Sequence, residues 1–84
     1  MKQLHQIIEE LESNKQNVRF AKLLSICEHF FGTPRIAGSH HIFKTPWPGD
    51  PRINIQMEKG AKGKPKPYQV KQVLQALKKL EGIQ

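Results

Sequence analysis

The sequence has a single cysteine and no long apolar run, and each shortage excludes a class of structure. Cys27 is the only cysteine, so neither an internal disulfide nor a zinc site built on two or four cysteines can form. No segment approaches the roughly 18 consecutive apolar residues of a membrane-spanning helix. Glu9, Glu10 and Glu12 lie where a secretory signal peptide would be hydrophobic. These absences predict a cytoplasmic protein with no membrane segment.

Acidic residues are also scarce, above all in the last third of the chain. Fourteen Lys and Arg residues stand against seven Asp and Glu, which gives a formal net charge of +7. Residues 59–80 contain seven lysines and no acidic residue. A solvated helix face can carry such a run, but the complete absence of acids favours a surface that binds a polyanion such as RNA. The phosphate-binding candidates here are Lys59, Lys62, Lys64, Lys66 and Lys71.

The apolar residues repeat with helical spacing in three segments. Leu4, Ile7, Ile8 and Leu11 predict an amphipathic helix within residues 1–14. A second helix is expected over residues 18–31, with Asn17 as its N-cap and Gly32 after its last turn. Cys27 lies on the apolar stripe of this helix, which indicates packing and not a reactive thiol. A final helix is expected to start at Pro67 and to stop at Gly82; its apolar stripe consists of Val70, Val73, Leu74 and Leu77.

Between the second and third helices the pattern is typical of strands. Residues 33–37 and 40–45 predict two short strands joined at Gly38, and the proline-rich residues 46–51 predict a turn. Residues 52–57 alternate strictly, which directs Ile53, Ile55 and Met57 to the core and Arg52, Asn54 and Gln56 outward. An 84-residue chain can bury one core. We therefore expect one α+β domain over residues 1–84, with the order ααβββα and a three-stranded antiparallel sheet packed on the helices.

Two adjacent histidines lie in the second predicted strand. Neighbouring strand residues point to opposite faces, so burial of Phe43 turns His41 inward and leaves His40 outward with Ile42. An imidazole can take a proton from one oxygen and give it to another, as cleavage of RNA through its own 2′-hydroxyl requires. The alternative is that the pair is structural or merely solvated. No Cys or carboxylate lies at ligand spacing around it, so no metal site is predicted.

Trp47 lies in the proline-rich turn, and two roles are open for it. An exposed indole can stack on an RNA base. It can equally pack over the edge of its own sheet.

The segment Gly38-Ser39-His40-His41-Ile42-Phe43, followed shortly by Pro46, resembles the HicA toxin family of prokaryotic toxin–antitoxin systems. The surrounding order is also similar: a helix before the motif, an alternating strand after it, and a lysine-rich segment leading into a closing helix. The resemblance covers roughly residues 18–82. Residues 18–82 are therefore taken as a HicA-like core, and residues 1–14 as an extra N-terminal helix.

The resemblance implies a fold similar to double-stranded-RNA-binding domains and a metal-independent endoribonuclease without a cofactor, an mRNA interferase that arrests growth. In that family the histidine after the Gly-Ser pair is catalytic, which corresponds to His40 here. Some members place the essential histidine one step later, so His41 is a second candidate. The implied partners are mRNA and a HicB-type antitoxin that covers the histidine face and inhibits the toxin.

The sequence departs from that family at the end of the third strand and at the start of the last helix. Gln56-Met57-Glu58 stands where many members carry a Pro-x-His, and Lys66-Pro67-Tyr68 replaces the usual glycine-led helix start. With His40 alone as base, a lysine or a water must protonate the leaving 5′-oxygen. Lys44 or Arg35 is expected to stabilise the charge that develops on the phosphoryl group.

Two other functions are compatible with the same residues. A non-catalytic module could read RNA by shape and backbone through the same lysines. An interaction subunit could use its first helix to dock on a partner protein.

Overall fold

Three α-helices and a three-stranded sheet make up residues 3–57 and 63–83, the part of the chain that the computed structural model describes. The elements are α1 (Leu4–Ser13), a short 3₁₀ helix η1 (Lys15–Asn17), α2 (Phe20–Phe31), β1 (Arg35–Ala37), β2 (His40–Phe43), β3 (Ile53–Ile55) and α3 (Pro67–Ile83). This confirms the predicted α+β class. None of the described helices is long and apolar enough to cross a membrane.

The sheet is antiparallel and open, with the strands in the order β1-β2-β3. A tight turn at Gly38, whose φ is 62°, joins β1 to β2 where the sequence predicted it. The register pairs His41 with Ile55 and Phe43 with Ile53. Because side chains alternate along each strand, these four residues share one face of the sheet, and His40, Ile42 and Asn54 share the other.

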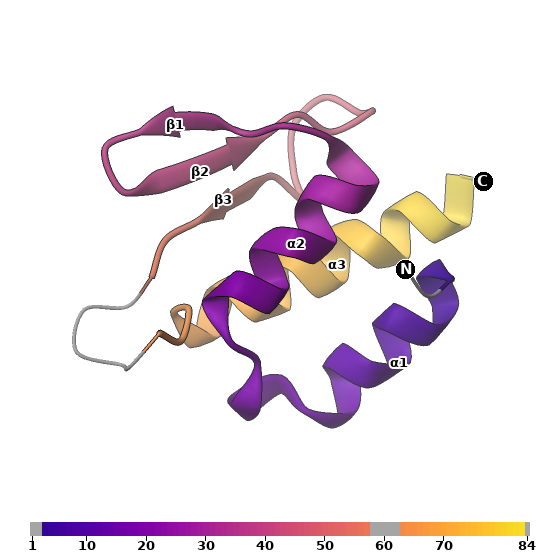
Figure 1. Cartoon of the computed structure of the whole chain (residues 1–84). Coiled ribbons are helices and arrows are strands. Elements are labelled where there is room, and N and C mark those ends of the chain that lie inside the picture. The colour runs from indigo at the N-terminus through magenta and orange to yellow at the C-terminus, as the bar shows by residue number, and fades with distance from the viewer. Residues whose placement is uncertain (1–2, 58–62, 84) are drawn as a thin grey trace.

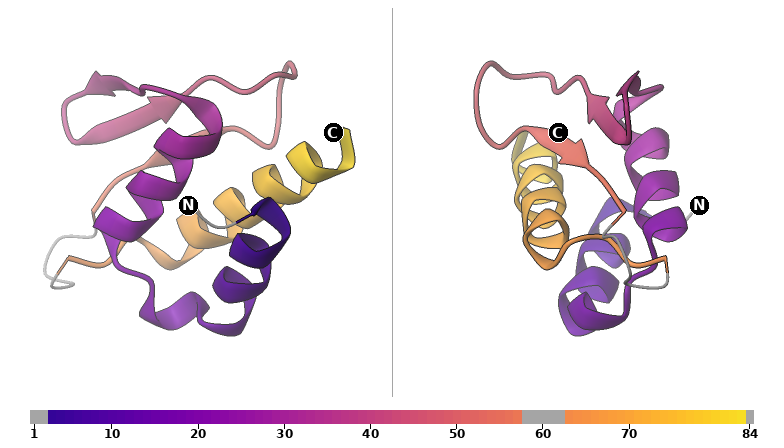
Figure 2. Two further views of the ribbon diagram at one scale, coloured as in Figure 1. Left: turned by 45° about the vertical axis from the view of Figure 1, so that its right-hand side comes forward. Right: turned by 90° about the vertical axis from the view of Figure 1, so that its left-hand side faces the viewer.

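The first of these faces belongs to the hydrophobic core. Phe43, Ile53 and Ile55 are buried in one cluster with the apolar stripes of all three helices. Leu23 of α2 and Leu77 of α3 are fully buried in it. In all views the sheet lies at one end of the molecule and α1 lies farthest from it, with α2 and α3 between them (Figures 1 and 2). The helices therefore support the sheet from one side and leave its other face open.

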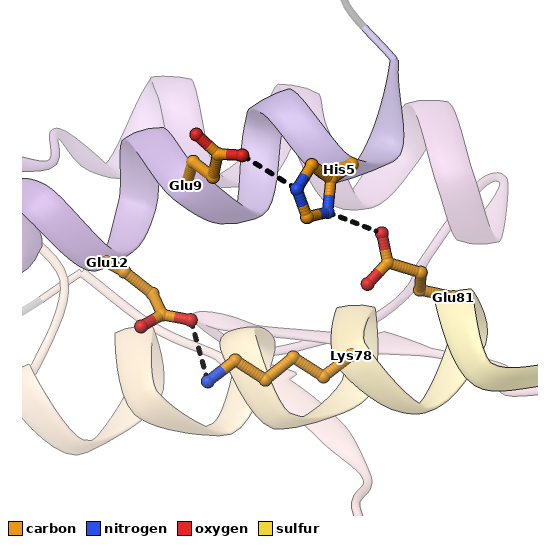
Figure 3. Close-up of polar contacts among 5 residues, drawn as sticks. All are labelled: His5, Glu9, Glu12, Lys78 and Glu81. Carbon is orange, nitrogen blue, oxygen red and sulfur yellow. Dashed lines mark hydrogen bonds and ion pairs between the residues drawn. The ribbon is translucent and has the colours of Figure 1, made fainter.

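Helix α1 shares this core with the rest of the chain. Its apolar stripe, predicted from helical spacing, is buried. Polar contacts at its surface join it to α3: His5 Nδ1 lies 2.9 Å from Glu81 Oε2, and Lys78 Nζ lies 2.7 Å from Glu12 Oε1 (Figure 3). The stripe that could have docked on a partner is therefore occupied within the chain.

Several boundary predictions are wrong. Met57, expected to face the core, is 49% exposed, because β3 ends at Ile55. The next backbone N–H, of Gln56, donates to the side-chain oxygen of the buried Gln69 on α3 and not to a neighbouring strand. The strand therefore turns away from the core before Met57, which forms only an isolated bridge with Pro65.

The second wrong boundary is the start of α2. Asn17, the expected N-cap, belongs to η1, and the helix starts at Phe20 and not at Val18. Arg19 is the N-cap and makes no side-chain cap bond. The backbone N–H of Phe20 instead donates to the carbonyl oxygen of Gly63 at 2.8 Å, so a distant segment caps this helix. At the other end of the chain, α3 continues to Ile83, one residue past the predicted stop.

Candidate active site on the open face of the sheet

The two histidines of β2 point to opposite faces, as strand parity predicted. His41 is half-buried, and its ring meets that of Phe20 edge-on, with 5.3 Å between the centroids. Its Nδ1 is buried and has no hydrogen-bond partner within the described residues. His40 lies on the open face and is also partly exposed. Of the two imidazoles, the one that a substrate can approach from the open face is that of His40.

A hydrogen bond from β3 orients the His40 ring. Its Nδ1 lies 3.0 Å from Oδ1 of Asn54. An amide oxygen can only accept, so this bond requires that Nδ1 carries the proton. Nε2 is then the unprotonated nitrogen of the neutral ring. Asn54 therefore selects the tautomer in which Nε2 can act as a base.

Two further polar contacts hold the chain next to His40 and Asn54. Gln56 Nε2 donates to Ser39 Oγ at 2.8 Å and so links the turn before His40 to the end of β3. The backbone N–H of Gln56 is held at 2.9 Å by Gln69, whose side chain is only 1% exposed. Because Gln69 belongs to the long helix α3, the strand end that carries Asn54 and Gln56 is anchored to the core.

An open hollow of about 550 Å³ lies beside Asn54, between the sheet and the loop that joins β2 to β3. Asn54 lines it, and so do three exposed cations: Arg35, Lys44 and Arg52. Within the described residues, none of these three makes an ion pair with a carboxylate. The structure therefore brings both predicted charge-stabilising residues, Arg35 and Lys44, to the same hollow as the residue that orients His40.

The predicted lysines are distributed differently. Lys59 and Lys62 lie outside the described residues. Lys64 and Lys71 line a second hollow of about 390 Å³ together with Lys15, which the sequence did not single out. Among the residues that the structure describes, none lines both hollows. The lysines of this second hollow therefore form a cationic surface separate from the one beside Asn54.

The isolated bridge between Met57 and Pro65 brings the lysine segment before α3 near the turn that precedes His40. Lys64 and Lys66 flank Pro65, and Met57 follows Gln56, whose side chain is bonded to Ser39 beside His40. Lys64 Nζ also donates to the carbonyl oxygen of Gln16 at 3.3 Å. The start of the segment leading into α3 therefore lies at the same end of the sheet as the histidine turn.

Trp47 packs against helices α2 and α3, whereas the two expected roles were packing over the edge of its own sheet and stacking on an RNA base. Its ring meets Phe31 of α2 edge-on at 6.1 Å, and Lys79 Nζ of α3 lies 5.1 Å from the ring centroid. Its indole N–H donates to the carbonyl oxygen of Pro51 at 2.9 Å. The half-buried ring thereby holds the loop after β2 against the body of the protein and forms part of the wall of the hollow beside Asn54.

Cys27 is fully buried, as predicted, and burial raises the pKa of its thiol to about 12. A thiol in that state is not a nucleophile near neutral pH. Among the described residues, no three His, Cys, Asp or Glu side chains gather into a group that could hold a metal ion.

Sequence reasoning missed Asn54, Gln56 and Arg52 as site residues. The alternation of residues 52–57 placed all three on the outer face, so part of the signal was present. The pairing register of β2 with β3 was missing, and only that register brings Asn54 beside His40.

Comparisons of this chain with protein-family models, with curated proteins and with solved structures found no match.

Proposed function

We propose that this chain is an RNA endonuclease, an mRNA interferase toxin of the HicA type, in which His40 is the general base. The observation that carries the proposal is the bond from His40 Nδ1 to Asn54 Oδ1, which leaves Nε2 as the unprotonated nitrogen of a ring on the open face of the sheet. The three cations of the neighbouring hollow support it, because RNA cleavage requires that negative charge be stabilised on the phosphoryl group.

The proposed reaction is an attack by the ribose on its own phosphate. His40 Nε2 removes the proton of the 2′-hydroxyl, and the resulting oxygen forms a bond to phosphorus as the bond to the 5′-oxygen breaks. The products are a 2′,3′-cyclic phosphate and a 5′-hydroxyl end. Lys44 or Arg35 stabilises the extra charge of the pentacoordinate state, and a lysine or a water protonates the leaving 5′-oxygen.

The proposed fold family, substrate and inhibitor come from the resemblance to the HicA family. The order helix, three antiparallel strands, helix after α1 supports a fold similar to double-stranded-RNA-binding domains. The proposed substrate is mRNA in the cytoplasm, held through phosphates by Lys64, Lys66 and Lys71 as well as the unplaced Lys59 and Lys62. The proposed inhibitor is a HicB-type antitoxin that covers the open face of the sheet. An adjacent gene that encodes a small acidic protein would support this partner.

Paired histidine variants test the assignment of the base. We expect His40→Ala to abolish cleavage of a defined RNA by the purified protein, because the imidazole that Asn54 holds is then absent. We expect His41→Phe to retain cleavage, because a phenyl ring can keep the packing against Phe20 and removes an unpaired buried nitrogen. Circular dichroism and urea unfolding check that both variants fold. Loss of cleavage with His41→Phe alone would move the role to His41.

The same assay distinguishes a non-catalytic RNA-binding module. Such a module would bind RNA through the same cations, lose affinity steeply with added salt, and give no cleavage product at any enzyme concentration. In that case His40→Ala would change neither binding nor growth of cells that express the protein.

A further inference from the structure

The hollow beside Asn54 has the size and the chemistry of a binding site for one nucleotide. Its volume of about 550 Å³ lies within the range of roughly 300–1,000 Å³ that small-molecule sites occupy. Arg35, Lys44 and Arg52 supply three positive charges along its walls. Such a site favours a ligand with negative charge.

Apart from Thr45 and Asn54, the rest of the wall is apolar and favours a flat ring. Ile42 projects from the open face of β2, and Trp47 and Pro48 come from the loop opposite. Contacts of this kind are made with nucleobases, since every base has an apolar face. The Trp47 ring is already held by Phe31 and by its hydrogen bond to Pro51, so little ordering remains to be done when a ligand binds. Cations and apolar surface in one hollow match a phosphate joined to a base.

Asn54 places this hollow beside the imidazole. The same side chain lines the hollow and accepts the hydrogen bond from His40. A nucleotide seated there would contact Asn54, the residue that holds the His40 ring.

We infer that the hollow is a subsite for one unstacked nucleotide of single-stranded RNA, the nucleotide adjacent to the bond that is cleaved, and that Arg52 binds its phosphate. The position relative to cleavage rests on the proposed endonuclease function. The requirement for a single strand follows from the hollow itself, since bases in an A-form duplex stay stacked inside and cannot enter it.

The test uses NMR spectra of the ¹⁵N-labelled full chain titrated with adenosine 5′-monophosphate. The indole N–H of Trp47, the only tryptophan, and the side-chain amide of Asn54 report on opposite parts of the hollow. We expect both signals to shift, and we expect Arg52→Ala to weaken binding roughly tenfold, as the loss of a hydrogen bond to a charged group does. The matched control is Lys22→Ala on α2, an exposed cation away from this hollow, which should bind as the wild type does.

Each remaining outcome decides one part of the inference. Unmoved signals of Trp47 and Asn54, or equal affinity in Arg52→Ala and wild type, overturn the subsite. If inorganic phosphate binds as tightly as the nucleotide, the nucleobase does not contribute to binding in the hollow. A blunt RNA duplex that shifts these signals as strongly as a single strand of the same sequence overturns the single-strand requirement. If the wild-type protein never cleaves RNA and nucleotide binding persists in His40→Ala, the subsite stands and the proposed endonuclease function is wrong.

Discussion

Ile7 tests whether α1 is a structural part of the domain or an appendage. Its side chain is only 1% exposed, in the cluster that α1 shares with α2, α3 and the sheet. Replacing a buried isoleucine by alanine removes its transfer free energy and leaves a cavity, at a cost of about 2–5 kcal/mol. The whole domain is expected to be stable by only about 4–13 kcal/mol, from roughly 0.05–0.15 kcal/mol per residue. Ile7→Ala should therefore remove a large share of the stability.

Ile36 provides the matched control, because it is the same residue type at 64% exposure on β1. Ile36→Ala should cost less than about 1 kcal/mol, the span of strand propensity. The free energy of unfolding of both variants is measured by urea denaturation followed by circular dichroism. A variant Ile7→Ala as stable as Ile36→Ala would contradict this prediction and would mean that α1 is only loosely attached. Deletion of residues 1–13 would in that case leave the fold intact, whereas we expect it to abolish folding.

Three further predictions follow from individual side chains. Asn54→Leu should reduce cleavage strongly without unfolding the protein, whereas Asn54→Asp should retain the ring orientation and move the acidic limb of the rate–pH profile to higher pH, because a carboxylate favours imidazolium; an unchanged profile would contradict the contact with His40. Cys27 should react with a thiol reagent only as fast as the protein unfolds in urea, since its pKa is raised to about 12, and rapid labelling of the native protein would contradict its burial. The hydrogen bond to Glu81, with the attraction of Glu81 and Glu9, raises the pKa of His5 above 6.5, so the stability that it adds should be present below that pH and be lost as pH rises through the higher folded value; His5→Ala should flatten this dependence in urea melts, and a variant with unchanged pH dependence would contradict it.

The elements could be predicted from the sequence because local patterns determine them. The helical spacing of Leu4, Ile7, Ile8 and Leu11 identified the buried stripe of α1, and Pro67 marked the first residue of α3. Strand parity separated His40 from His41 with no knowledge of the neighbouring strands, since it depends only on the burial of Phe43.

Contacts between segments far apart in the chain could not be predicted in the same way. The start of α2 depends on a carbonyl of Gly63, more than 40 residues away, so no local cap residue could indicate it. The exposure of Met57 depends on Gln69, which takes the backbone N–H that a continuing strand would use. The partner of His40 required the register of β2 with β3, which a pattern of alternation within one strand does not contain.

A single modified RNA tests whether cleavage proceeds through the 2′-hydroxyl that His40 is proposed to deprotonate. The purified protein is incubated under single-turnover conditions with a short RNA that it cleaves, and with the same RNA carrying one 2′-deoxyribose on the 5′ side of the cleaved bond. The proposal predicts a 2′,3′-cyclic phosphate on the cleaved RNA and no cleavage at the modified position, because His40 has no 2′-hydroxyl proton to remove. Cleavage of the modified bond at the normal rate would contradict it.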